Sequence, residues 1–439
     1  MLSAQMAAVR RTFIALRNRN FCLFWTGSVV SQAGTWVQNT ALAWLMLQLT
    51  HSPLAFSTLT TIQFAPTLGF SLFGGVLADR LPKRPLLLTT QSVMMVQAFV
   101  LAALTASGLI NVWEIYALTL ISGTANALDN PTRQAFVIEL VGPEDLPNAV
   151  ALTSSQYQLA RLTGPALGGI GIATIGSAGC FFVNALSFLA VIGALIAMRP
   201  RDFISVPTPA RGAVLKQVGA GVRYSVRTPD IALVMLLMAV LGTFGYNFSV
   251  YFPLVARNLL HAGAVGFGVV TSTAAIGSVL ASLGVAYLGR ATRRTLLIGA
   301  TGFSLMLGAV ALSHAWALTL PLLVGLGMTS SIFTAVANSR AQMVSEPQYR
   351  GRVMSIYMLL FLGSTPVGAL IFGALASVAG VSIGLAEMAA VCLAGVVAAL
   401  IVMRRLRDRL LPESALVAEA RRLEEAPQEA SIEAGSAVH

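Results

Sequence analysis

Long apolar stretches that carry almost no charge dominate this chain of 439 residues. Hydrophobic residues make up 56% of the sequence and charged residues only 10%, which is more apolar surface than a water-soluble domain of this length could bury. The charges are also segregated, and they leave apolar stretches of about 18 residues or more, the length that crosses a bilayer as a helix. In lipid these stretches must be helices, because open strands would leave backbone groups unpaired. We predict twelve spans, near 21–47, 54–78, 86–106, 113–129, 149–173, 178–198, 230–253, 263–288, 295–313, 316–336, 354–376 and 381–403.

The basic residues fall on one side of the predicted membrane topology. The net charge is +11, and all but two of the 28 Lys and Arg residues lie at the termini or in loops on that side. The exceptions are Arg161, inside a span, and Arg257, in a loop on the opposite side. By the positive-inside rule, both termini and the central linker are expected in the cytoplasm. Because the charge forms no folded basic domain, we expect a lipid bilayer around the chain and no nucleic-acid partner.

The sequence offers no pattern typical of a metal site or of catalysis. Cys22, Cys180 and Cys392 lie in or at apolar spans without Cys-x-x-Cys spacing, so we interpret them as small packing residues. The four histidines lie in loops on the opposite side or at the C-terminus, and neither of the two lysines follows a glycine as a Walker A motif requires. We therefore expect no catalytic residues, no cofactor, no metal and no enzymatic activity.

The two halves of the chain resemble each other in sequence as well as in hydropathy. The segment Gly34-Thr35-Trp36 in the first span matches Gly242-Thr243-Phe244 in the seventh span, 208 residues further along. The pair Lys83-Arg84 matches Arg293-Arg294 at an offset of 210 residues. Similar offsets in the same order indicate a duplicated bundle of six helices. We predict an N-terminal bundle over 1–198, a linker over 199–229, a C-terminal bundle over 230–403 and a partly disordered tail over 404–439.

A short charged loop from Gly75 to Arg84 joins the second and third spans. Its glycine, aspartate and basic cluster are a group with which a helical transporter can latch its two halves together, and a weaker copy runs from Gly284 to Arg294. A contact that forms in only one of two conformers biases the equilibrium between them. The alternative is that these charges only set the membrane topology.

The loop and the span pattern together resemble the major facilitator superfamily of transporters. The resemblance implies an all-α integral membrane protein of twelve helices in two pseudo-symmetric six-helix bundles. The loop is similar to the superfamily's motif A, although Pro82 stands where the superfamily usually has glycine. By this resemblance the latch residues are Gly75, Asp79, Arg80, Lys83, Arg84, Asp129 and Arg133.

In the latch that the resemblance implies, Asp79 contacts the start of the eleventh span and pairs with basic loop residues and with Asp129, the acid at the end of the fourth span. A carboxylate at a helix N-terminus is stabilised by about 0.3–1 kcal/mol. The corresponding positions in the second half are Gly289 and Ala337. We therefore predict an acidic latch in the first half only.

The fifth span carries Gly164-Pro165-Ala166-Leu167-Gly168-Gly169, which is similar to the core of motif C of the superfamily's exporters. Gly164 and Gly168 permit close approach of another helix, and Pro165 can kink the span. Generic packing of small residues would explain the same pattern. Further segments are similar to the enterobactin-exporter and macrolide-efflux branch, at 18–21, 31–36, 130–135, 147–152, 159–161 and 350–354.

Polar residues inside three spans are candidates for a substrate cavity. Arg161 lies near the midplane of the fifth span, where an arginine costs about 2.5–3.5 kcal/mol unless it faces the bundle interior. It either attracts an anionic or oxygen-rich substrate group, serves as the positive partner in the transport cycle, or is a structural arginine. The amides and hydroxyls either meet the substrate or bond neighbouring helices. The candidates are Gln32, Thr35, Gln38 and Asn39 in the first span, Gln158 and Arg161 in the fifth, and Thr243, Tyr246 and Asn247 in the seventh.

No Asp or Glu lies near a midplane in the predicted spans, so proton antiport is implied by the resemblance alone. Asp129 and Glu387 are the candidate coupling residues. The sequence therefore predicts an exporter of the bacterial inner membrane that moves a small siderophore-like or drug-like molecule outward by alternating access and works as a monomer. The alternatives are an uptake carrier for a nutrient or metabolite, and a non-transporting sensor on the same fold.

Overall fold

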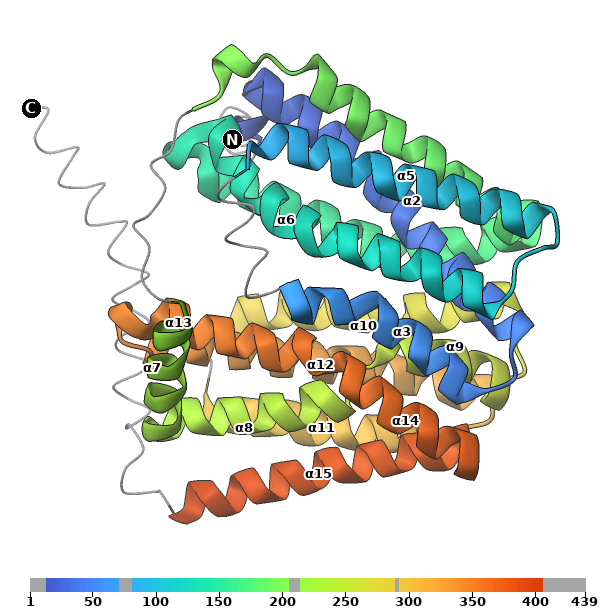
Figure 1. Cartoon of the computed structure of the whole chain (residues 1–439). Helices are drawn as coiled ribbons and strands as arrows, with labels where there is room; N and C mark the ends of the chain where they lie inside the picture. Colours follow the sequence, from blue (N-terminus) through green and yellow to red (C-terminus); the bar gives the residue numbers. More distant parts are fainter. Residues whose placement is uncertain (1–12, 71–80, 205–213, 289–291, 406–439) are drawn as a thin grey trace, which may run out of the picture.

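The structure, a computed structural model, describes residues 13–70, 81–204, 214–288 and 292–405, and every regular element within them is a helix. Two groups of helices lie side by side, with α5, α6 and α2 in one and α8, α11, α12 and α15 in the other (Figure 1). One apolar core lies within the first group, and a larger one fills the second and reaches helices of the first through residues such as Leu45 and Phe181. The first is built around Phe24, Phe136 and Phe188, and the second around Phe303 and Phe333.

In its described residues, the first half of the chain has fewer α-helices than predicted spans, because α6 is unusually long. Its elements are η1 (Ile14–Arg17), α2 (Arg19–Leu49), α3 (Pro53–Phe70), α5 (Lys83–Ala106), α6 (Val112–Ala197) and η2 (Pro200–Asp202). As a straight helix, the 86 residues of α6 would be about 130 Å long, several times the thickness of a bilayer core. Gly142 and Gly176 interrupt it with φ values of 75° and 72°, which a residue with a Cβ rarely adopts, and so divide it into three traverses.

The first traverse of α6 continues past residue 129, where the sequence predicts its end, to Val141. The prediction ends the span at Asp129, the next charged residue after Glu114 near its start. The helix continues because Phe136 and Leu140 are fully buried in the first core and hold the additional turns against the bundle. Asp129 and Arg133 therefore lie on a helix and not in a loop.

The second half begins with a helix inside the predicted linker. Its elements are α7 (Val214–Arg227), α8 (Pro229–Phe244), α9 (Phe248–Leu254), the π-helix η3 (Val255–Leu259), α10 (Ala264–Leu288), α11 (Arg293–Leu312), α12 (Trp316–Val344), α13 (Pro347–Met358), the π-helix η4 (Leu359–Gly363), α14 (Thr365–Ala379) and α15 (Val381–Arg405). Helix α7 lies beside α13 (Figure 1), where the ring of Tyr224 stacks on that of Tyr349 with centroids 4.3 Å apart.

Eight helices in the described part of the chain are long and apolar enough to cross a membrane, and α6 counts as one of them. Two further helices, α2 and α3, coincide with the first two predicted spans but are not among the eight. Helix α2 carries the polar stripe of the first span, and of the second predicted span only residues 54–70 lie in α3.

The bundle has two ends, which we name for their charge. The basic side carries Lys83 at the start of α5, Arg293 at the start of α11 and Arg405 at the end of α15. The opposite side carries the loop after α2 and the π-helix η3. The ribbons of the two bundles draw together on the opposite side and diverge toward the basic side, which is on the left in Figure 1.

Candidate functional site

Glycines join the two bundles on the opposite side. A Cβ added to Gly169 of α6 would lie 2.9 Å from the carbonyl oxygen of Ala264, and one added to Gly268 of α10 would lie 2.8 Å from that of Pro165. Real Cβ atoms essentially never approach another heavy atom this closely, so neither position has room for a side chain and the backbones of α6 and α10 are in direct contact. This contact requires glycine in both bundles at once.

A second contact between the bundles joins α3 to α14. The Thr61 hydroxyl donates a hydrogen bond of 3.2 Å to the carbonyl oxygen of Pro366, and a Cβ on Gly373 would collide with the Ser57 side chain. Nearby, Arg257 of η3 donates 3.2 Å to the carbonyl oxygen of Thr50. The bundles are thus held together by helix backbones and by a loop clasp on the opposite side.

The other glycines of the fifth-span motif face into the first bundle. A Cβ on Gly168 would lie 2.6 Å from the Cβ of Thr40, and one on Gly164 would collide with the Trp36 side chain. Both partners lie on α2, and Pro165 is buried between them. The motif therefore has two contact faces, one that fixes α6 on α2 and one, at Gly169, that meets the second bundle.

Arg161 lies one turn before this motif, with its side chain exposed. It lies within electrostatic range of Tyr246, which belongs to the segment between α8 and α9 of the other bundle. On the same face of α6, the Tyr157 ring meets that of Trp36 edge-on with centroids 6.0 Å apart, and Gln158 is exposed. Arg161 is therefore an exposed cation of the first bundle within electrostatic range of the second.

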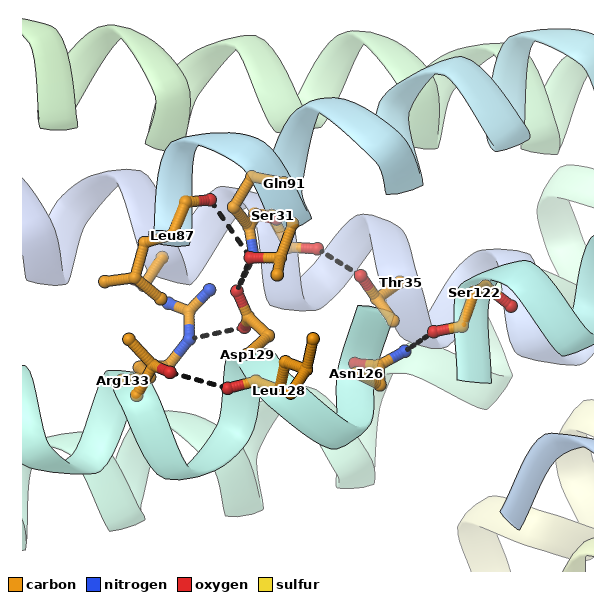
Figure 2. Close-up of polar contacts among 12 residues, drawn as sticks. Ser31, Thr35, Leu87, Gln91, Ser122, Asn126, Leu128, Asp129 and Arg133 are labelled. Carbon is orange, nitrogen blue, oxygen red and sulfur yellow. Dashed lines mark hydrogen bonds and ion pairs between the residues drawn. The ribbon is translucent and has the colours of Figure 1, made fainter. Parts of the chain in front are cut away.

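The polar stripe of α2 divides between two environments. Gln38 is buried, and its amide donates 3.3 Å to Gln97 and accepts 2.8 Å from Asn184, so it points into the first bundle. Gln32, Thr35 and Asn39 are half-buried. The Thr35 hydroxyl bonds back to Ser31 on its own helix, as Figure 2 also shows. The stripe therefore combines contacts between helices with side chains that remain accessible.

The matching residues of the second half lie where α8 ends and α9 begins. The Tyr246 ring stacks on Phe303 with centroids 4.8 Å apart, and its hydroxyl donates 2.7 Å to the carbonyl oxygen of Ser330. Asn247 is 1% exposed and donates 2.6 Å to the carbonyl oxygen of Thr243. Its side-chain oxygen is buried without a hydrogen-bond partner. The break between α8 and α9 thus holds Tyr246 against Phe303 and Ser330 and keeps Asn247 buried.

Asp129 is the centre of a buried polar network in the first bundle. Its carboxylate accepts hydrogen bonds from the Thr90 hydroxyl at 2.7 Å and the Gln91 amide at 2.9 Å, both on α5. It also pairs with Arg133 at 3.2 Å, and Figure 2 shows Asp129 between Arg133 and Gln91. Arg133 donates 2.7 Å to the Ser28 hydroxyl of α2. The network therefore ties three helices together near the basic side.

The rest of the predicted latch is placed only in part. Gly75, Asp79 and Arg80 lie outside the described residues. Lys83 pairs with Glu139 of α6 at 2.5 Å. Arg84 donates 2.7 Å to the carbonyl oxygen of Leu195, near the end of α6. Both basic residues thus fix the start of α5 to α6.

A second buried carboxylate, which the sequence-based predictions do not include, lies in the other bundle. Asp230 at the start of α8 is 2% exposed and receives two hydrogen bonds from Arg293 of α11, at 2.7 and 2.8 Å. Arg340 of α12, itself 1% exposed, donates 2.7 Å to the same carboxylate. The second half therefore has an acidic centre too, but its acid comes from its first span and not from its fourth.

Spacing could have indicated this cluster. Arg340 follows Arg133 by 207 residues and Arg293 follows Lys83 by 210, so both cations match their counterparts in the repeat. The acid does not follow this offset, because the position corresponding to Asp129 is Ala337. The other sequence signal for this cluster was Asp230 itself, an aspartate in the first turn of a span that begins with Pro229.

Glu387, the other candidate coupling residue, lies on α15 with its side chain exposed. Helix α15 lies at the outer edge of the second bundle in Figure 1, and it packs on α8, α11 and α14. Within the described ranges, Glu387 makes no hydrogen bond or ion pair. It therefore lies apart from both buried carboxylate networks.

Solved transporters share this arrangement of helices. A bacterial homologue of the human lysosomal transporter Spinster, inward-facing and unoccupied, matches with a TM-score of 0.67 over 92% of this chain and 97% of its own, at 13% identity. A POT family transporter in complex with 5-aminolevulinic acid matches with a TM-score of 0.70 over 88% of this chain and 96% of its own, at 10% identity. The chain shares the fold of these transporters, and the predicted all-helical membrane fold is confirmed.

The chain belongs to the family described as transmembrane secretion effector, whose pattern matches residues 10–433. A staphyloferrin A transporter of Staphylococcus aureus is 25% identical over 82% of this chain and 90% of its own length. A multidrug efflux pump of Mycolicibacterium fortuitum is 26% identical over 87% and 95%. An enterobactin exporter of Citrobacter koseri is 26% identical over 74% and 78%. The protein is therefore a multi-pass membrane transporter of small molecules and not an enzyme, as the sequence predicts.

Proposed function

We propose that this transporter is a secondary active exporter that moves a small organic molecule out of the cytoplasm by alternating access, coupled to protons. The observation that carries the proposal is the two-faced glycine motif of α6. Gly164 and Gly168 fix the helix on α2, and Gly169 meets Gly268 of the other bundle. A contact made of bare backbone holds the bundles closed but engages no side chain, so the two bundles can separate without breaking an ion pair.

Arg161 is the proposed substrate contact. An arginine in the middle of a membrane span is costly, and this one is exposed and forms no ion pair with a carboxylate of the described residues. A substrate with an anionic or oxygen-rich group would supply the missing partner. The relatives named for staphyloferrin A, enterobactin and several drugs support a siderophore-like or drug-like molecule.

The remaining cavity residues would complete this contact. Gln32, Thr35, Asn39 and Gln158 are accessible polar side chains from the first bundle, and Thr243 and Tyr246 come from the second. The amide of Gln38 is engaged with Gln97 and Asn184, and Asn247 is buried against its own helix, so both would act by positioning their neighbours.

Asp129 is the better supported of the two coupling candidates. Its carboxylate joins α5 to α6, and its partner Arg133 extends the network to Ser28 of α2. Glu387 lies on the outer helix α15, away from that network. The proposal places the protein in the bacterial inner membrane as a monomer, with both termini on the cytoplasmic side. The distribution of basic residues supports this orientation.

Transport into inverted membrane vesicles under an imposed proton gradient tests the proposal. Wild type, Arg161→Met and Arg161→Lys would be compared on a panel of siderophores and macrolides, with membrane abundance measured for each. Gradient-dependent accumulation of one class is expected in wild type. Arg161→Met should lose it, and Arg161→Lys should retain part of it because the charge is kept.

Three other outcomes would contradict the proposal in different ways. Accumulation only in right-side-out vesicles would indicate uptake and not export. Absence of gradient-driven flux in proteoliposomes, for every compound, would favour a sensor on the same fold. Normal export by Arg161→Met would make Arg161 a structural residue.

A further inference from the structure

A groove of about 680 Å³ lies between α11 and α15 at the basic side, away from the facing surfaces of the two bundles. Basic residues mark one end and apolar residues line the rest. Its lining includes Arg293, Arg294, Ile298 and Thr301 of α11 and Leu400 and Met403 of α15.

The lining of the groove changes from charged to apolar along the membrane normal. Arg294, Ile298 and Thr301 lie on one face of α11, four and then three residues apart. From Arg294 to Thr301 the helix rises about 10 Å, which is a third of the thickness of a hydrocarbon core. A ligand that fills this groove therefore has a charged end at the membrane surface and an apolar end at depth.

Only part of the positive charge at the basic end of the groove, which we call its mouth, is paired within the described residues. Arg293 is engaged with Asp230 through two hydrogen bonds. Arg294 is exposed, and within the described residues it makes no hydrogen bond or ion pair. The helix that forms the other wall ends in Arg404 and Arg405, directly after Met403, and both are exposed. The mouth therefore attracts negative charge.

The wall of the groove faces outward from the bundle. The Ile298 side chain is 58% exposed, and Ile401, next to Leu400, is 48% exposed. In a membrane-spanning protein, such surfaces contact the acyl chains of lipids. The occupant is consequently a molecule of the bilayer itself.

We propose that this groove is a binding site for one anionic phospholipid of the leaflet on the basic side. The phosphate would bind Arg294, with support from Arg404 and Arg405, and an acyl chain would lie along Ile298 and Thr301. Basic pockets between membrane helices hold anionic head groups through charge-assisted hydrogen bonds. An apolar groove alone would accept any acyl chain, and the arginines add the preference for a negative head group.

Native mass spectrometry of the purified full-length protein in detergent measures this preference. Phosphatidylglycerol and phosphatidylcholine with identical acyl chains would be titrated separately, and glycerol phosphate would be added as a competitor without acyl chains. The variants are Arg294→Ala, which removes the charge, and Thr301→Trp, which fills the groove. Arg227→Ala, an exposed arginine at the end of α7, is the matched control.

Wild type is expected to bind one phosphatidylglycerol at least about tenfold more tightly than phosphatidylcholine. Arg294→Ala should weaken phosphatidylglycerol binding about fivefold and leave phosphatidylcholine unchanged. Thr301→Trp should weaken both, Arg227→Ala neither, and glycerol phosphate should not compete. The proposal is overturned by equal binding of the two lipids, by unchanged binding in Arg294→Ala, or by full competition from glycerol phosphate, which would indicate a site for a free phosphate group.

Discussion

Replacing Asp230 by alanine removes the carboxylate that three helices of the second bundle share. The cost comes mainly from Arg340, because its side chain is 1% exposed and its ion pair with Asp230 is broken inside the protein. Removing one member of a buried ion pair costs about 3–5 kcal/mol. Arg293 contributes less, because its side chain is 15% exposed and can turn toward water. We therefore expect Asp230→Ala to lower the free energy of unfolding by about 3–5 kcal/mol.

Asp129→Ala is the matched control in the first bundle. Asp129 is also buried, but two of its three donors, Thr90 and Gln91, are neutral. Arg133 keeps its hydrogen bond to Ser28 when the carboxylate is lost. The expected cost is therefore smaller, about 1–3 kcal/mol, the penalty for leaving buried polar groups without one partner.

Unfolding of the purified protein in mixed micelles, driven by sodium dodecyl sulfate and followed by circular dichroism, measures both variants. A double-mutant cycle with Arg340→Met identifies the cause, because methionine fills a similar length without charge. The double variant should recover at least about 2 kcal/mol relative to Asp230→Ala alone. Equal losses in Asp230→Ala and Asp129→Ala, or no recovery in the double variant, would refute the reasoning.

Three further predictions concern the transport cycle. Gly268→Leu places a side chain against the carbonyl oxygen of Pro165 and should shift the protein toward the state that is open on the opposite side. The rate at which a cysteine at position 158 is labelled from that side measures the shift. Gly263→Leu is the control and should leave the labelling rate unchanged, because a Cβ at Gly263 would have no neighbour within 4 Å. Arg257→Ala removes the loop clasp and should increase the same labelling by less than tenfold, since a partly exposed hydrogen bond contributes about 1 kcal/mol. Asp129→Asn should abolish the dependence of flux on the pH gradient while Glu387→Gln retains it, and the reverse pattern would move coupling to α15.

The fold could be predicted from the sequence because one physical requirement governs it everywhere. Apolar stretches in lipid must be helices, and the charged residues show where each helix leaves the membrane. The predicted end of the fourth span was wrong, because charged residues there do not mark the point where the helix ends. Asp129 and Arg133 lie on a helix that continues to Val141, since they are satisfied inside the bundle by Gln91, Ser28 and each other.

The site could be predicted only in part, because hydropathy does not fix the direction in which a buried helix face points. Gln38 and Asn39 are adjacent on α2, yet Gln38 is buried in hydrogen bonds within the first bundle and Asn39 is half-buried. Asp230 could not be recognised from its own segment. Its partners Arg293 and Arg340 lie 63 and 110 residues away, and only the packing of α8 against α11 and α12 brings them together.

The two carboxylate networks show how the duplicated halves have diverged. Both halves keep a cation on their fourth span, Arg133 and Arg340, and a cation at the start of their third, Lys83 and Arg293. The acid lies beside its cation on the same helix in the first half, so Asp129 bonds Arg133 one turn away. In the second half the acid, Asp230, lies on α8, three residues after α7 ends, so the same kind of pairing fixes the first span of that bundle and the end of the linker. Loss of the Asp230 carboxylate should therefore loosen α8 in the second half. Loss of the Asp129 carboxylate should loosen only the contact between α5 and α6 in the first half.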